Sequence, residues 1–212
     1  MNIKEIYVLN TALDGKQIFY LPDFSKLHLS NILIDDVKEL MIEKGLLESA
    51  SSLTMEGVKI AKRMEDFKNA KKYIKLGPLV IGIKDEHEGV LLKHIPEYED
   101  YSFERIDLTD SALNITESYP FLHETDSSPA DIEPEKLTLE EVQKRFNLDI
   151  ENCVYLSTMN LEGAKEVSEV NITNEMIFAF EGNLYLYDRG TGLLFRKGKN
   201  EILQLIQERM AA

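Results

Sequence analysis

The segments Glu43-Lys-Gly-Leu-Leu47 and Leu53-Thr-Met-Glu-Gly57 mark the best-defined local structure in this sequence. Before them, apolar residues recur at helical spacing from Ile32 to Lys44, and Gly45 suits the position just past a helix end. After them, the Thr54 hydroxyl can cap a second helix. The pattern predicts two helices separated by a short polar loop.

The flanking segments favour β-structure. Ile3 to Leu21 mixes β-forming residues around the turn dipeptide Asp14-Gly15, which predicts two strands, or a strand and an extended arm. The second helix is expected to end before Gly77-Pro78. Two β-rich runs, Leu79 to Lys84 and Gly89 to Ile95, then predict a hairpin. The expected apolar stripe of the second helix is Val58, Ala61, Met64 and Phe67.

The last third of the chain repeats this mixture of elements. Thr138-Leu-Glu-Glu141 is a capping box, which predicts a helix reaching about Phe146. Before this part of the chain, a further helix is expected from Asp110 to Ser118, ending at Pro120. Four strands and a final helix are expected at Cys153 to Thr158, Met176 to Glu181, Leu184 to Asp188, Leu193 to Lys197 and Glu201 to Met210.

These elements predict an α+β fold with a mainly antiparallel sheet and flanking helices. Residues 1–122 form the expected N-terminal half, residues 123–137 an exposed acidic linker, and residues 138–212 the C-terminal half. Each half contains a helix, a β-hairpin and a trailing helix. The order of elements therefore suggests two pseudo-symmetric halves.

The composition limits the kinds of partner. The chain has 212 residues, and 24 Lys and Arg against 38 Asp and Glu give a formal charge of −14. Such a charge repels nucleic-acid phosphates and anionic lipid, so we expect a protein partner, no nucleic acid and no membrane insertion. The start lacks a secretory signal pattern and no apolar run could span a bilayer, which predicts a cytoplasmic location. The oligomeric state stays open.

No set of catalytic or metal-binding groups is evident. The densest ligand cluster, Asp85-Glu86-His87-Glu88, falls at an expected hairpin tip and is typical of a solvated turn. The single cysteine, Cys153, precedes a β-run and is expected to be a small buried hydrophobe. No nucleotide-binding or nucleophile motif occurs. We therefore predict no enzyme activity, no metal and no cofactor. The four histidines are widely spaced: His28, His87, His94 and His123.

The two predicted helices around Gly45 and Thr54 resemble the later part of a winged helix-turn-helix. DNA binding would also require an exposed basic face. Glu65 and Asp66 interrupt the basic residues, which spread around the helix, so a solvated face is favoured over a DNA surface. The basic stretch consists of Lys59, Lys62, Arg63, Lys68, Lys71, Lys72 and Lys75.

The same region also resembles the EsaE-like cytosolic chaperones of type VII (ESX) secretion in Gram-positive bacteria, and more distantly the mycobacterial EspG proteins. The likeness lies in Glu43-Lys-Gly-Leu46, Leu53-Thr-x-x-Gly57, the long following helix, Glu117-Ser-Tyr-Pro-Phe-Leu122 and the hairpin carrying Leu184-Tyr-Leu-Tyr187. The resemblance implies an α+β fold with two pseudo-symmetric halves, no catalytic residues, and binding of secretion substrates before export.

We therefore expect a non-catalytic chaperone or adaptor for a type VII secretion substrate. The alternatives are an acidic immunity protein that neutralises a basic toxin and a degenerate winged-helix regulator. For the binding site, strand alternation places Tyr185 and Tyr187 on one face, with Leu184 and Leu186 inward. Partly exposed tyrosines would suit partner binding. The competing interpretation is that both rings pack under the C-terminal helix.

Overall fold

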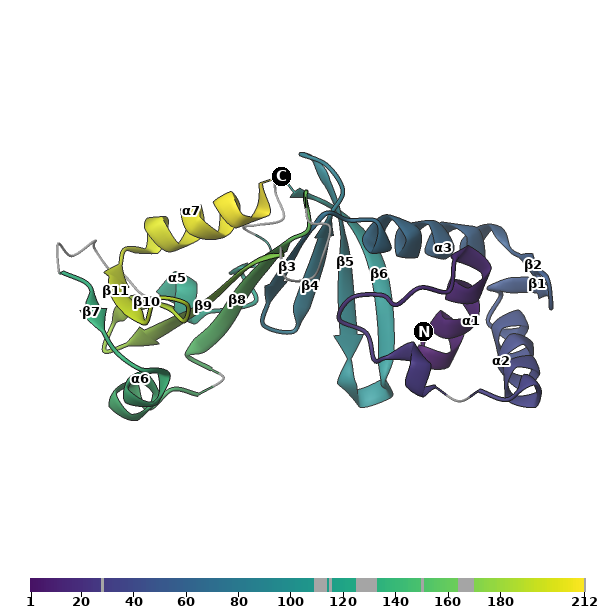
Figure 1. Ribbon diagram of the computed structural model, residues 1–212, viewed down its shortest axis with the longest axis horizontal. Coiled ribbons are helices and arrows are strands. Elements are labelled where there is room, and N and C mark those ends of the chain that lie inside the picture. The colour runs from purple at the N-terminus through teal and green to yellow at the C-terminus, as the bar shows by residue number, and fades with distance from the viewer. Residues whose placement is uncertain are drawn as a thin grey trace.

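The protein is described by a computed structural model that covers residues 1–27, 29–108, 114, 116–124, 133–149, 151–163 and 170–211. Its centre is one antiparallel sheet in the order β6-β5-β4-β3-β8-β9-β10-β11-β7 (Figure 1). This confirms the predicted α+β class. The strands are β3 (Lys72–Leu76), β4 (Leu79–Ile83), β5 (Glu88–Ile95), β6 (Asp100–Asp107), β7 (Glu135–Lys136), β8 (Cys153–Asn160), β9 (Asn171–Phe180), β10 (Asn183–Asp188) and β11 (Leu193–Lys197).

The strands from the two parts of the chain meet in the middle of this sheet. β3 pairs with β8 from Lys72 opposite Asn160 to Leu76 opposite Leu156. Most of the predicted linker lies outside the described residues, but its Glu135–Lys136 forms β7, which pairs with β11. The predicted helix from Asp110 to Ser118 also lies mainly outside them. The division into 1–122, 123–137 and 138–212 stays a prediction.

Helices cover the two faces of the sheet at different places. α1, α2 and α3 form one group beside β5 and β6, whereas α6 and α7 lie at the other end of the molecule (Figure 1). The helices are α1 (Ile3–Leu13), α2 (Asn31–Glu43), α3 (Met55–Lys68), α5 (Phe121–Glu124), α6 (Leu139–Phe146) and α7 (Lys199–Met210). Two short strands, β1 (Leu47–Ser49) and β2 (Ser52–Leu53), and two 3-10 turns, η1 (Phe24–Lys26) and η2 (Pro96–Tyr98), complete the described elements.

Strand alternation separates the buried side chains into two cores on one face of the sheet and a third core on the other. On the face that we call the α6 face, Tyr73 of β3 belongs to the core beneath α1–α3, and Phe178 of β9 belongs to the core beneath α6. On the opposite α7 face, Ile74 and Ile177 lie in a third core with α5 and α7. Each buried large apolar side chain contributes about 1.5–3 kcal/mol, so these cores hold the helices on the sheet.

The beginning of the chain is a helix, so the predicted strands between Ile3 and Leu21 are wrong. Asn2 and Glu5 form a capping box that starts α1. Ile6 and Leu9 are buried against α2 and α3. The β-forming side chains fit a helix because tertiary packing outweighs their modest intrinsic preference. Asp14 ends the helix, and Gly15 follows at a φ of +67°.

The two predicted helices around Gly45 and Thr54 are confirmed as α2 and the start of α3, whereas the predicted polar loop between them is wrong, because β1 and β2 pair there as a short hairpin. The Thr54 hydroxyl accepts a bond from Gly57 N–H at 3.0 Å and donates to Gly45 O at 2.6 Å. The predicted extension of the second helix to Gly77-Pro78 is wrong, because α3 ends at Lys68 and β3 follows. Ala61, Met64 and Phe67 are buried as predicted, whereas Val58 is exposed.

The remaining predicted elements are confirmed, with small shifts at their ends. β4 and β5 form the expected hairpin, and the Thr138–Glu141 capping box starts α6. β11 has its predicted bounds, whereas β9 begins at Asn171 instead of Met176. α7 begins at Lys199.

Candidate protein-binding surface

The middle of the α6 face is not covered by any described helix. Lys75 on β3, Ser157 on β8 and Asn174 on β9 lie opposite one another in the register of the sheet and form one row. The Ser157 hydroxyl donates to the Asn174 side-chain oxygen at 2.8 Å. This row lies between the core beneath α1–α3 and the core beneath α6. We call it the floor row, and it forms the bottom of an open sheet face.

Larger side chains stand on both sides of the floor row. Tyr155 precedes Ser157 on β8 and is 41% exposed. Met159 follows Ser157, and its partner on β9, Ile172, is 55% exposed. Because alternate residues of a strand share a face, these side chains project from the same face as the floor row. The open sheet face is therefore a shallow groove with apolar walls.

A loop from the N-terminal part of the chain adds two aromatic rings near the groove. Phe19 and Tyr20 lie 5.1 and 6.3 Å from the ring of Tyr73, and both are more than one-third exposed. Tyr20 adopts a φ of +64°, which costs a non-glycine residue about 1–2 kcal/mol. The Gln17 side chain fixes this conformation by donating to the carbonyls of Ile18, Leu21 and Pro22. Strain held in place in this way is often found at binding sites.

A cavity of about 740 Å³ deepens the surface beside Tyr155. Its lining includes Pro78, Leu148 and Cys153, together with Tyr119, whose hydroxyl donates to Leu76 O at 2.9 Å. Burial, reinforced by the carboxylate of Asp149, raises the pKa of the Cys153 thiol to about 11. Cys153 is thus a protonated group that is half-buried in the cavity lining, whereas the sequence predicts a fully buried side chain.

Two cations stand at the ends of the floor row. Lys75 itself begins the row, and its ammonium lies 5.8 Å from the ring centre of Tyr20. Arg189 donates its backbone N–H to Asn174 O at the other end, and its guanidinium lies 5.7 Å from the ring centre of Tyr155. Within the described ranges neither cation has a carboxylate partner. Arg189 also lines the cavity, so both charges face the groove.

The predicted pair Tyr185 and Tyr187 lies elsewhere, in the core beneath α6. The two rings do share a face, as predicted, and Leu184 and Leu186 are buried on the other. The expectation of exposure is wrong for Tyr187, which is 3% exposed and donates its hydroxyl to Leu137 O at 2.9 Å.

Tyr185 is half-buried, stacking on Phe178 and contacting Phe146. The alternative that both rings pack under the C-terminal helix is also wrong, because α7 covers the opposite face and α6 covers the tyrosines. Partner binding through Tyr185 stays a prediction.

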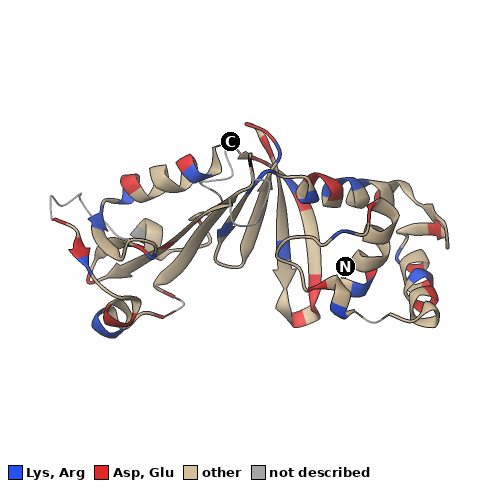
Figure 2. Cartoon of the chain, in the orientation of Figure 1, with Lys and Arg blue, Asp and Glu red and all other residues tan. Residues whose placement is uncertain are grey.

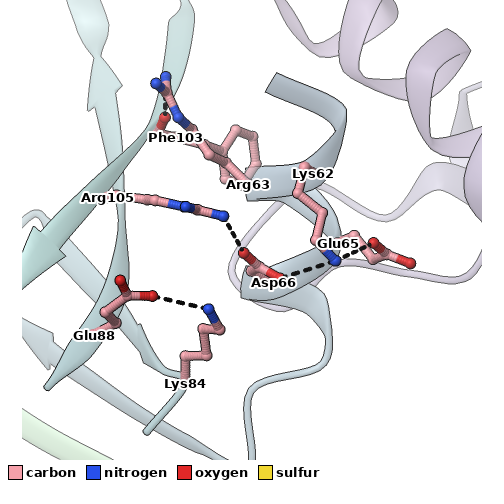
Figure 3. Close-up of polar contacts among 8 residues, drawn as sticks. All are labelled: Lys62, Arg63, Glu65, Asp66, Lys84, Glu88, Phe103 and Arg105. Atoms are coloured by element: carbon pink, nitrogen blue, oxygen red, sulfur yellow. Dashed lines mark hydrogen bonds and ion pairs between the residues drawn. The ribbon is translucent and has the colours of Figure 1, made fainter. Parts of the chain in front are cut away.

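The basic stretch is largely engaged within the molecule. Along α3, Lys and Arg alternate with Asp and Glu (Figure 2). The buried Asp66 carboxylate forms two ion pairs, one oxygen lying 3.3 Å from Lys62 and the other 3.0 Å from Arg105 of β6 (Figure 3). The other contacts are Lys59 with Glu56, Arg63 with Phe103 O, Lys68 with Asp14 and Lys72 with Ala211 O. A phosphate would have to compete with these partners.

The Asp85–Glu88 segment forms the tip of the β4–β5 hairpin. The Asp85 carboxylate accepts the backbone N–H groups of His87 and Glu88, and Lys84 pairs with Glu88 at 2.8 Å (Figure 3). These bonds are those of a closed turn. Among the residues that the structure describes, no group of three or more His, Cys, Asp or Glu could hold a metal ion.

The sequence alone does not predict the open sheet face, because β3 is far in the chain from the β8–β9 pair beside which it lies. One signal was available in β8: Tyr155, Ser157 and Met159 alternate with the apolar Val154 and Leu156. A strand that is buried on one face and mixed on the other indicates incomplete cover. Which part of the sheet the helices leave open depends on tertiary packing.

Comparisons with known proteins agree with this architecture. Residues 1–192 match the family described as Domain of unknown function (DUF5081). No curated protein matches the sequence. Among solved structures, the chain is similar to the Mycobacterium tuberculosis type VII secretion system chaperone EspG5, solved in complex with a PE25-PPE41 dimer. The TM-score is 0.56 at 12% identity, over 99% of this chain and 93% of that chain.

No described helix is both long and apolar enough to cross a membrane. At 12% identity the likeness to EspG5 concerns the fold, whereas the family match extends over most of the sequence. The protein therefore belongs to the family described as Domain of unknown function (DUF5081), and its fold is similar to that of a type VII secretion chaperone.

Proposed function

We propose that this protein is a cytosolic, non-catalytic chaperone or adaptor that binds a type VII secretion substrate before its export. The observation that carries the proposal is the fold similarity to EspG5, which extends over 99% of this chain. EspG5 itself is found in complex with another protein pair, the PE25-PPE41 dimer. A binding role of the same kind requires a partner surface and no catalytic group.

The open sheet face supplies a suitable partner surface. Protein interfaces are enriched in tyrosine, phenylalanine and arginine, because large flat side chains bury much area with little loss of conformational entropy. The groove combines Phe19, Tyr20 and Tyr155 with Arg189, and it is flanked by two packed cores that keep its walls in place. The cavity beside Tyr155 can receive an anchoring side chain of the partner.

The EsaE-like assignment forms the finer part of the proposal. It is supported by the Glu43-Lys-Gly-Leu46 and Leu53-Thr-x-x-Gly57 segments, which build the junction between α2 and α3. Under this assignment the substrate is a protein exported by the type VII system of the same cell, and the complex forms in the cytoplasm.

Co-expression tests the proposal. The tagged full-length chain is produced with each candidate type VII substrate of its own cell, and complexes are isolated by size-exclusion chromatography. We expect a stable complex with at least one substrate, and less of that substrate exported when the chain is deleted. Absence of any complex together with unchanged export would refute the role. Neutralisation of a toxin without an effect on export would instead favour the immunity protein.

A further inference from the structure

We propose that the open sheet face binds one amphipathic helix of the partner, through an apolar stripe flanked by two carboxylates that meet Lys75 and Arg189. The inference rests on the proposed function, because it describes the segment through which a protein partner would be recognised. It follows from the width of the groove, the chemistry of its floor and the placement of the two cations.

The backbone spacing of the groove walls is close to the diameter of a single helix. Tyr155 and Met159 stand on either side of Ser157, four residues apart on β8, which corresponds to about 13 Å along an extended strand. An α-helix with its side chains is about 10–12 Å across. Ser157 and Asn174 are short and bonded to each other, so they leave the centre of the floor low. A helix lying along the floor row would bring its apolar stripe against Tyr155 and Ile172.

A helix suits this surface better than an extended segment. The face of a sheet offers side chains only, because the backbone groups of β3, β8 and β9 are already paired with neighbouring strands. A bound strand would leave its own N–H and C=O groups without partners, whereas a helix satisfies them internally.

The cations define the polar part of the partner. The backbones of Lys75 on β3 and Arg189 beside β9 are three strand spacings apart, about 14 Å, and the Arg189 guanidinium reaches back over Tyr155 of β8, which shortens the distance between the charges. Carboxylates seven residues apart lie on the same side of a helix, about 10 Å apart at 1.5 Å per residue, and could meet both cations. Each cation already lies over an aromatic ring and has no carboxylate partner in the described part of the chain. Because the whole protein carries a charge of −14, the acidity of the partner must be local.

Two synthetic helical peptides of about 20 residues, six turns long, provide the test. Both carry the same leucine stripe, flanked about seven residues apart by two glutamates in one peptide and two lysines in the other. Binding of each fluorescein-labelled peptide to the full chain is measured by fluorescence anisotropy. We expect the glutamate peptide to bind at least about tenfold more tightly than the lysine peptide. Equal binding, or no binding of the glutamate peptide, would overturn the inference.

Charge reversal locates the contact. Lys75→Glu with Arg189→Glu should exchange the preference, so that the lysine peptide binds more tightly. The matched control is Lys4→Glu with Lys136→Glu, which changes net charge equally at two exposed lysines outside the groove and should leave the preference unchanged. Ser157→Trp, which raises the floor, should weaken both peptides. Thermal unfolding verifies that each variant is folded.

The proposed secretion role and the proposed helix-binding groove can fail separately. If the Lys75→Glu, Arg189→Glu variant still captures and exports its substrate normally, the proposed function stands and the groove assignment is wrong. If the peptides behave as expected but no type VII substrate binds, the groove is a helix-binding site and the secretion role is wrong.

Discussion

Replacement of Gly57 by alanine separates local helix preference from tertiary packing. Gly57 is in the first turn of α3, where alanine would ordinarily be favoured over glycine by about 1 kcal/mol. A Cβ at this position would lie 2.1 Å from Leu46 O and 3.1 Å from a methyl carbon of Leu53. The carbonyl is part of the backbone, so α3 would have to move away from the segment that precedes β1.

The expected cost follows from the contacts that this movement disturbs. Overpacking against fixed atoms costs about 1–3 kcal/mol. The Thr54 cap of Gly57 N–H contributes about 1 kcal/mol, and so does the bond from Thr54 N–H to Leu46 O. After subtracting the gain in helix preference, Gly57→Ala should lower the free energy of unfolding by about 2–4 kcal/mol. For a chain of this size the melting temperature should fall by about 5–15 °C.

Urea and thermal unfolding followed by circular dichroism measure this cost. The matched control is Gly190→Ala, because a Cβ at this exposed position would meet no backbone atom and only one side-chain atom, Asp188 Oδ1, at 3.2 Å. We expect the control to remain within about 0.5 kcal/mol of the parent. A Gly57→Ala variant as stable as the parent, or more stable, would refute the argument that this glycine permits close approach of α3 to Leu46.

Three further predictions follow from burial and charge. In urea unfolding, Tyr187→Ala should lower the free energy of unfolding by about 3–5 kcal/mol, and Tyr187→Phe by only about 1 kcal/mol. A small effect of Tyr187→Ala would contradict the burial of this ring. Because its pKa is raised to about 11, Cys153 should react with Ellman's reagent at pH 8 about 100-fold more slowly in the folded chain than in urea. Equal rates would contradict the protected thiol. The chain should give no mobility shift with duplex DNA at physiological salt, and a salt-sensitive shift at micromolar protein would revive the winged-helix regulator.

Local signals predicted much of the fold. The Thr54 and Thr138 caps, the turn after α2 and the β4–β5 hairpin each depend on a few neighbouring residues, and the structure has them where the sequence indicated. The wrong predictions concern elements whose structure depends on contacts between distant segments. α1 contains β-forming residues but is helical because Ile6 and Leu9 pack against other helices. β3 lies where the sequence predicts the end of a helix, although its Tyr73-Ile74 pair favours a strand.

The candidate site was less accessible to prediction. The aromatic-rich sequence around Tyr185 and Tyr187 predicts an exposed binding site there, but α6 covers that region of the sheet. Strand alternation correctly placed the two tyrosines on one face. It could not show which face a helix would cover, because both faces of β10 are packed. The groove depends on the pairing of β3 with β8, which brings Lys75 beside Ser157 from a distant part of the sequence.

Photo-crosslinking in the native cell tests the central claim most directly. Benzoylphenylalanine is introduced in place of the exposed aromatic residue Tyr155 on the groove wall, and in place of the exposed Lys4 on α1 as a control. We expect illumination to join a type VII substrate to the chain from position 155 and not from position 4, with mass spectrometry identifying the adduct. An adduct from neither position, or adducts only with proteins that do not depend on type VII export, would contradict the account.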